Sequence, residues 1–215
     1  MYHFLTHKLY FPPHEMASEE GILALGGDLS PERLLFAYQN GVFPWFNEDE
    51  PIIWWSPPKR MVVNIHEYKT PKTIRNIINK NIFQVTYNQS FKEVIKGCKT
   101  IKRNGQLGTW LTDDMENAYL KLHEMGVAKS VEIWQNNELV GGLYGMDMGN
   151  YFCGESMFSR VSNASKVAFV WLINFLKDKN YLLLDCQVHN HYLEQLGAFE
   201  IPRDSFLKII SHRKD

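Results

Sequence analysis

Two apolar segments of this sequence each end in a short polar cluster, and this pair of interruptions limits the folds open to the chain. LLL at 182–184 is followed by DCQ, and YFC at 151–153 is followed by GES. Strand side chains alternate between faces, so Asp185 and Gln187 are expected on one face and Cys186 on the other. Buried polar groups need partners. The two interruptions therefore predict a cleft where neighbouring strands splay, unless Asp185 only caps the following turn and Gln187 bonds to backbone.

The segments around these clusters predict an α+β domain built on a mostly antiparallel sheet. Asn136-Asn137 separates two alternating runs and is a hairpin signal. A buried, largely apolar helix is expected from about Ala164 to Lys177. Strands are expected over residues 129–135, 138–146, 181–188 and 205–210.

Three amphipathic helices are predicted between residues 70 and 125. Thr70-Pro71 opens the first helix, and Ser90 with Glu93 forms a capping box for the second. The third covers residues 112–125 and ends before Gly126.

The first sixty residues are rich in loop-forming and aromatic residues. We expect a small N-terminal α+β domain over residues 1–60, followed by the main domain over residues 61–215. One helix is clear in the first domain, with Ser30 as N-cap and Pro31 at its first position.

Charge is uneven along the chain although the formal net charge is only -1. Residues 1–60 carry four Lys or Arg against eight acids, whereas residues 69–103 carry nine against one. This asymmetry indicates a local site for a polyanion, and a solvated surface is the plainer alternative.

The cysteine count indicates a reducing, cytoplasmic protein. Cys98, Cys153 and Cys186 form no C-x-x-C motif, and no signal peptide or long apolar span is recognised. His189 and His191 lack further residues at metal-ligand spacing, so no metal site is expected.

A series of motifs in this chain resembles the leucyl/phenylalanyl-tRNA–protein transferase family, in family order and over nearly the whole length. The motifs are GILALGGDLSPERL at 21–34, GVFPWF at 41–46, WWSP at 54–57, GTW at 108–110, VGGLYG at 140–145, GESMFSR at 154–160, NASK at 163–166, DCQ at 185–187 and LGA at 196–198.

The resemblance implies a GNAT-like (acetyltransferase-like) main domain. It implies transfer of Leu or Phe from aminoacyl-tRNA to the N-terminal amine of a protein that begins with Arg or Lys, which marks that protein for N-degron degradation. Leu-tRNA, Phe-tRNA and the acceptor protein are the expected partners, and no cofactor or membrane is expected.

The resemblance also assigns roles in the reaction. Gln187 contacts the attacking amine, and Asp185 either polarises it through a relay or only orients the amide. The aminoacyl pocket is assigned to Leu143, Phe152, Met157, Leu172 and Leu184, for each of which ordinary core is the alternative. Such an apolar pocket with a flexible methionine is expected to accept some Met.

The remaining assignments concern the tRNA and the acceptor. Trp45 and Trp110 match the positions that stack on the terminal adenosine. Glu155 and, more weakly, Asn190 face the basic acceptor terminus, and an internal salt bridge from Glu155 to Arg160 is the alternative. Phosphate contacts are expected from Lys72, Arg75 and Lys80.

Three rival functions fit the sequence less well. An acyl-CoA N-acetyltransferase is disfavoured because SRVSNASK at 159–166 contains no glycine for close approach to a pyrophosphate. A non-catalytic tRNA-binding module would not explain the presence of Asp185, Gln187 and Glu155. A nucleophilic Cys186 or Cys153 lacks a convincing histidine partner.

Overall fold

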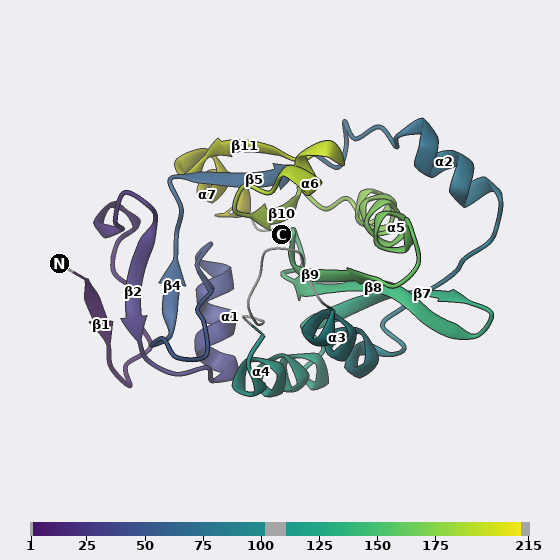
Figure 1. The fold of residues 1–215 in the computed structure, drawn as a ribbon. Coiled ribbons are helices and arrows are strands. Elements are labelled where there is room, and N and C mark those ends of the chain that lie inside the picture. The colour runs from purple at the N-terminus through teal and green to yellow at the C-terminus, as the bar shows by residue number, and fades with distance from the viewer. Residues whose placement is uncertain (1, 102–110, 212–215) are drawn as a thin grey trace.

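The computed structural model describes residues 2–101 and 111–211, which form a four-stranded and a seven-stranded sheet with helices around them (Figure 1). The four-stranded sheet has the order β1-β2-β4-β3, where the strands are His3–Leu5, Ile22–Gly26, Phe43–Pro44 and Ile53–Trp55 in chain order. A short 3-10 turn, η1 (His14–Met16), precedes β2.

Helix α1 (Pro31–Gln39) packs beside this sheet and begins as the sequence predicts. The Ser30 hydroxyl accepts a hydrogen bond from the Arg33 backbone N–H, and Pro31 occupies the first position. Gly41 follows the helix with φ of 69°, a left-handed conformation that suits glycine.

The larger sheet has the order β11-β5-β10-β9-β8-β7-β6. Its strands are β5 (Lys59–Val63), β6 (Gln84–Tyr87), β7 (Ala128–Gln135), β8 (Glu138–Asp147), β9 (Phe152–Ser159), β10 (Leu184–Gln187) and β11 (Phe199–Pro202). Among the described strands of this sheet, β9 and β10 pair in parallel and the other neighbours are antiparallel. The predicted mostly antiparallel sheet is confirmed, as is the hairpin at Asn136 and Asn137, which both have positive φ.

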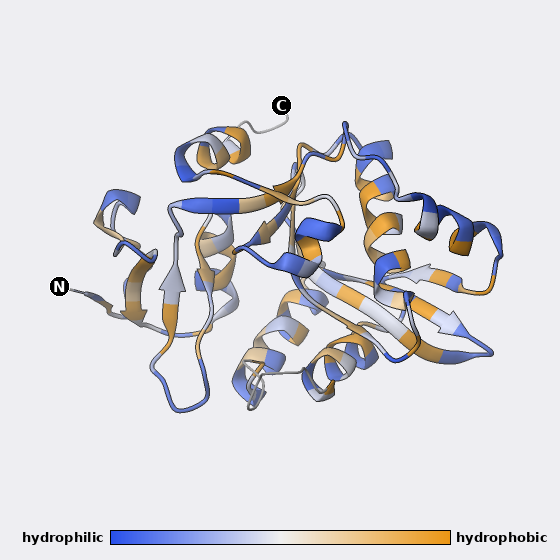
Figure 2. Ribbon diagram, turned by 45° about the horizontal axis from the view of Figure 1, so that its top comes forward, coloured by the Kyte–Doolittle hydropathy of each residue, from blue (hydrophilic) through white to orange (hydrophobic). Residues whose placement is uncertain are grey.

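Helices cover both faces of this sheet. The helices that follow β5 in the chain are α2 (Lys72–Asn79), α3 (Phe91–Thr100), α4 (Asp113–Glu124), α5 (Ala164–Asp178), α6 (His191–Gln195) and α7 (Arg203–Ser211). Figure 1 shows α3 and α4 on one face and α5 on the other, with α2 against α5. Helix α5 is largely hydrophobic, as Figure 2 shows, and most of its residues are buried. No helix in the described part of the chain is long and apolar enough to cross a membrane.

The two sheets share a hydrophobic core. β4 ends at Trp55 and β5 begins at Lys59, so we propose a division of the chain into residues 1–60 and 61–215 close to this junction. One cluster of buried side chains nevertheless joins Leu34 and Tyr38 of α1 to Met115 and Tyr119 of α4. The smaller unit is therefore packed onto the larger one through α4.

The prediction of a last strand at 205–210 is wrong. These residues lie in α7, and the last strand is β11, which pairs with β5. Phe206 and Ile210 are four residues apart and both buried, which is helical spacing. A short apolar run fits either period, so this segment was ambiguous in sequence. The strand expected at 181–188 is confirmed but is shorter, spanning Leu184–Gln187.

The predicted capping box at Ser90 is also wrong. The Ser90 side chain makes no cap at the start of α3. The backbone N–H groups of Gln89 and Ser90 instead donate to Glu132 Oε1 at 3.2 and 3.3 Å. Glu132 is fully buried on β7 and also accepts from the hydroxyls of Thr86 and Ser130. The Glu132 carboxylate, distant in sequence, thus accepts the Ser90 N–H hydrogen bond that the capping box assigned to Glu93.

Candidate active site

The two polar strand ends lie beside a cavity of about 510 Å³. In the parallel pairing of β9 with β10, Leu184 pairs with Phe152 and Asp185 pairs with Cys153, and the pairing ends there. Beyond this point Glu155 on β9 and Gln187 on β10 line the cavity. The predicted splaying of the sheet is confirmed.

The cavity has an apolar part and a polar part. Apolar side chains from β8, β9, α5 and β10 include Leu143, Met157, Phe169, Leu172 and Leu184. The polar side chains include those of Glu155, Ser156, Ser165, Gln187, Asn190 and Tyr192. Phe43, Pro44 and Trp45, next to β3, add an aromatic wall from the N-terminal segment.

A β-bulge shapes the chain where β10 meets the cavity. The register with β5 shifts between Asp185 and Gln187, and Gln187 has φ of 65°. A bulge adds a residue to one strand and breaks the alternation of side chains. Cys186 and Gln187 therefore both line the cavity, whereas Asp185 does not. The expectation that Asp185 and Gln187 share a face, with Cys186 opposite, is wrong for this reason.

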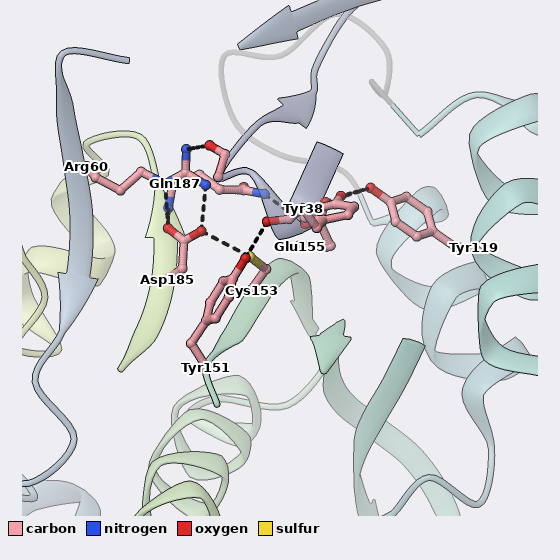
Figure 3. Close-up of polar contacts among 9 residues, drawn as sticks. Tyr38, Arg60, Tyr119, Tyr151, Cys153, Glu155, Asp185 and Gln187 are labelled. Atoms are coloured by element: carbon pink, nitrogen blue, oxygen red, sulfur yellow. Dashed lines mark hydrogen bonds and ion pairs between the residues drawn. The ribbon is translucent and has the colours of Figure 1, made fainter. Parts of the chain in front are cut away.

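Asp185 is held in a buried ion pair with Arg60 of β5 (Figure 3). Arg60 Nε and Nη2 donate to the two carboxylate oxygens at 2.7 and 2.6 Å, and the Cys153 thiol donates to Oδ2 at 3.0 Å. The Gln187 backbone N–H donates to Oδ1 at 2.9 Å. Asp185 thus contacts the backbone of Gln187 and fixes the path of the chain there.

The Arg60 guanidinium is packed as tightly as it is bonded. It lies between the rings of Phe43 and Phe206, 4.6 and 4.5 Å from their centroids, and Nη1 donates to the Gly41 carbonyl. Burial alone would lower the pKa of Arg60, but the Asp185 carboxylate outweighs it and raises that pKa. The guanidinium therefore stays charged inside the protein.

A second polar chain leads away from the side chain of Gln187. Gln187 Nε2 donates to Glu155 Oε1 at 2.8 Å, and the Tyr119 hydroxyl donates to Glu155 Oε2 at 2.7 Å. The Tyr38 and Tyr119 hydroxyl oxygens are 2.8 Å apart. Burial raises the pKa of Glu155 to about 7, against the opposing effects of the Tyr119 and Tyr38 hydroxyls.

The other predicted site residues differ in how they lie relative to the cavity. Trp45 is 40% exposed at its wall, with its ring 5.6 Å from that of Trp55. Trp110 lies outside the described residues. Asn190 lines the cavity while its side chain caps α6 by accepting from two backbone N–H groups. Phe152, the first residue of β9, is buried in the core and does not line the cavity.

The predicted phosphate-binding residues are on the surface. Lys72 and Arg75 are exposed on α2, and Lys80 is exposed at its C-terminal end. Arg160 donates to the Leu139 carbonyl and lies over the Phe158 ring, so the alternative pairing of Glu155 with Arg160 is not formed among the described residues.

Sequence reasoning missed three residues of the site: Arg60, Tyr38 and Tyr119. The signal for Arg60 was an arginine directly before the apolar run MVV at 61–63, since a charge entering a buried strand needs a partner. The tyrosines carried no comparable signal, because each sits in an ordinary amphipathic helix. No three His, Cys, Asp or Glu side chains within residues 2–101 and 111–211 are grouped to hold a metal ion.

A mostly antiparallel sheet that splays at a parallel pair over a cavity is the architecture of a GNAT-like fold. FemX, a solved structure, superposes with a TM-score of 0.51 at 12% identity, covering 84% of this chain and 71% of that one. The fold is therefore GNAT-like.

Comparison of the sequence gives the family. The model described as leucyl/phenylalanyl-tRNA protein transferase matches residues 62–211, and that of its N-terminal domain matches residues 27–58. A leucyl/phenylalanyl-tRNA–protein transferase of Flavobacterium johnsoniae is 58% identical over 98% of this chain and 100% of its own length. One from Flavobacterium psychrophilum is 59% identical over 97% and 99%. The chain belongs to the leucyl/phenylalanyl-tRNA–protein transferase family, and it is an aminoacyltransferase.

Proposed function

We propose that the protein transfers Leu or Phe, and some Met, from aminoacyl-tRNA to the N-terminal α-amine of proteins that begin with Arg or Lys, and so marks them for N-degron degradation. The observation that carries the proposal is the cavity between β9 and β10. It combines an apolar part of suitable chemistry for an aminoacyl side chain with Glu155 and Gln187 at its polar part. Because the reaction uses charged tRNA, we also propose that it takes place in the cytoplasm.

The reaction needs little chemical activation. The neutral amine nitrogen attacks the ester carbonyl carbon, the new C–N bond forms, and the C–O bond to the ribose breaks. The proton lost by the amine goes to the departing ribose oxygen. An α-amino group has an unperturbed pKa of about 7.7–8.0, so much of it is neutral near pH 7.5. Holding amine and ester together supplies up to about 7–11 kcal/mol of the barrier.

Gln187 is our choice for the group that orients the amine. Its Nε2 donates to Glu155, so its Oε1 is the end of the amide left to accept a hydrogen bond from the amine. Asp185 acts as a positioning residue in this proposal, because it bonds the Gln187 backbone and Arg60 and does not line the cavity. The Glu155 carboxylate, together with Asn190, attracts the basic acceptor terminus.

The aminoacyl side chain is proposed to lie against Leu143, Met157, Leu172 and Leu184. These residues line the apolar part of the cavity. Phe152 belongs to this set only indirectly, since it is the register partner of Leu184 on the neighbouring strand. Met157 is only partly buried, and its flexible side chain suits both Leu and Phe.

The tRNA is proposed to approach over the N-terminal wall of the cavity. Trp45 offers an exposed ring for the terminal adenosine, and a base–aromatic stack contributes about 1–3 kcal/mol. We assign the same role to Trp110. Lys72, Arg75 and Lys80 would contact phosphates without reading sequence, which suits an enzyme that accepts several tRNAs.

The direct test is transfer of labelled Leu from Leu-tRNA to a peptide that begins with Arg. The same peptide beginning with Gly is the control, and it should receive no label. Acetyl-CoA replaces Leu-tRNA in a third reaction. Acetylation of the Arg peptide without any leucylation would contradict the proposal and favour an acyl-CoA-dependent enzyme.

A further inference from the structure

The hydroxyl groups of Tyr38 and Tyr119 form a hydrogen-bonded chain whose direction can be worked out. Tyr119 gives its single hydroxyl proton to Glu155 Oε2. It therefore has none left for Tyr38, so in the 2.8 Å contact between the two hydroxyls Tyr38 must be the donor. The order of donation is Tyr38 to Tyr119 to Glu155, and Gln187 donates to the other oxygen of the same carboxylate.

This direction decides which end of the Gln187 amide is free. An ionised carboxylate only accepts, so Glu155 holds the Nε2 end of the amide and the Oε1 end is left over. Tyr38 and Tyr119 are both fully buried, and neither lines the cavity. They come from α1 and α4, which pack together in the shared core.

We propose that Tyr38 and Tyr119 are positioning residues, which act through Glu155 to hold the Gln187 carboxamide with its oxygen toward the acceptor amine. The inference rests on the proposed function and deepens it, because it makes two residues outside the cavity part of acceptor recognition. If Glu155 took up a proton, it could donate to Oε1 instead, and the amide could turn its NH₂ group toward the amine. An NH₂ group cannot accept from an amine, so that orientation is unproductive.

Several charged or titratable groups act on Glu155 from the elements packed around it. They are Tyr38 of α1, Arg60 of β5, Tyr119 of α4, Cys153 of β9 and Asp185 of β10. The Tyr119 and Tyr38 hydroxyls and Arg60 favour the carboxylate form, whereas burial and Asp185 favour the protonated form. Removing one hydroxyl should therefore move the ionisation of Glu155 to higher pH.

The test uses Tyr119→Phe and Tyr38→Phe, which keep the rings and remove one hydroxyl each. Tyr119→Phe removes a hydrogen bond to the charged form of Glu155, so it should shift the acid limb of kcat upward by about 1 pH unit. Tyr38→Phe should shift it in the same direction by less. Between pH 6 and pH 7, kcat should fall about 5- to 10-fold for Tyr119→Phe, with KM for Leu-tRNA unchanged.

Tyr181→Phe is the matched control. The Tyr181 hydroxyl donates to the Asp147 carboxylate at 2.7 Å, the same distance as in the Tyr119–Glu155 bond, and it does not line the cavity. This variant should leave the pH profile of transfer in place. A shift of equal size in Tyr181→Phe would overturn the proposal, because any lost tyrosine–carboxylate bond would then do the same.

A measurement on the free enzyme separates this inference from the proposed function. Carboxyl-carbon NMR of isotopically labelled protein follows the Glu155 titration without tRNA, assigned by its loss in Glu155→Gln. The titration should move to higher pH in both tyrosine variants. Superimposable titrations in wild type and Tyr119→Phe would overturn the inference, whereas a wild type that transfers no Leu would overturn the function itself. If one variant does not fold, the other carries the test.

Discussion

Arg60 and Asp185 form a two-bond ion pair with 2% and 0% of their side chains exposed. The pair joins β5 to β10 and also holds the backbone N–H of Gln187 through Asp185 Oδ1. Because it is sealed from the cavity, the pair has a structural effect on the site: it sets the chain direction from which the Gln187 side chain emerges.

Substitutions of Asp185 should therefore distinguish a structural role of this residue from a role in proton transfer. Asp185→Ala leaves the Arg60 charge buried without its partner and should lower the free energy of unfolding by about 3–5 kcal/mol. Asp185→Asn keeps an oxygen for the Gln187 N–H and should retain more stability and more transfer activity than Asp185→Ala. Chemical denaturation and Leu transfer, each measured on both variants, check this.

Asp113→Ala is the control for the Asp185 variants. Asp113 pairs with Lys99, but its side chain is 90% exposed, so its loss should change stability far less than the loss of Asp185 does. Near-total and equal loss of activity in Asp185→Asn and Asp185→Ala, with both folded, would instead support a proton relay through Asp185.

The raised pKa of Glu155 predicts that the protein becomes less stable as pH rises. The usual value is 4.5 and the folded protein holds it at about 7. Between these values the folded state binds a proton that the unfolded state has released. The stabilisation is complete below pH 4.5 and is lost as pH rises through 7.

Urea denaturation of wild type and Glu155→Gln at pH 5 and pH 8 measures this effect. From pH 5 to pH 8, wild type should lose about 2.5 kcal/mol relative to the variant. The variant lacks the titrating group, so it serves as the reference for all other ionisations. The quantity compared is the difference in unfolding free energy between wild type and Glu155→Gln. If this difference stayed constant, or grew in favour of wild type at pH 8, burial would not raise the pKa of Glu155.

The cavity lining predicts a change of specificity on enlarging the apolar part. Leu172→Ala should reduce kcat/KM for Leu-tRNA more than for Phe-tRNA, and raise the Phe-to-Leu ratio by about 10-fold, because the larger ring refills the space. Phe152→Leu is the control, since Phe152 is equally buried but does not line the cavity. It should lower stability by about 1–3 kcal/mol and leave the ratio alone. Equal changes of the ratio in both variants would argue against the assigned pocket.

The polar ends of two strands were enough to predict the cleft, because an unpaired polar group inside a sheet is costly wherever it lies. The partners of those groups were not predictable in the same way. Arg60 and Asp185 are 125 residues apart, and no local pattern links them. The faces of Asp185 and Cys186 were predicted wrongly because the alternation rule assumes a regular strand, and the bulge at Gln187 breaks it.

Surface charge predicts the salt dependence of tRNA binding. Changing Lys72, Arg75 and Lys80 to Glu should weaken binding and lower the slope of log affinity against log salt by about 2–3. Reversing Lys8, Lys121 and Lys208, which are exposed and lie outside α2, controls for net charge and should have a smaller effect. Filter binding of Leu-tRNA from 50 to 200 mM salt measures both. Equal slopes in the two triple variants would mean that α2 has no special place in tRNA binding.

The start of α3 offers a comparison between a local and a distant carboxylate. Sequence spacing assigned its cap to Glu93, whereas Glu132 accepts from the N–H groups of Gln89 and Ser90. Glu132→Ala would leave those donors, the Thr86 hydroxyl and the buried Ser130 hydroxyl without their acceptor, so it should lower the free energy of unfolding by about 2–4 kcal/mol. Glu93→Ala is the matched change of an exposed residue and should cost within about 0.5 kcal/mol. Chemical denaturation of both variants measures this difference. A larger loss of stability in Glu93→Ala than in Glu132→Ala would support the capping box instead.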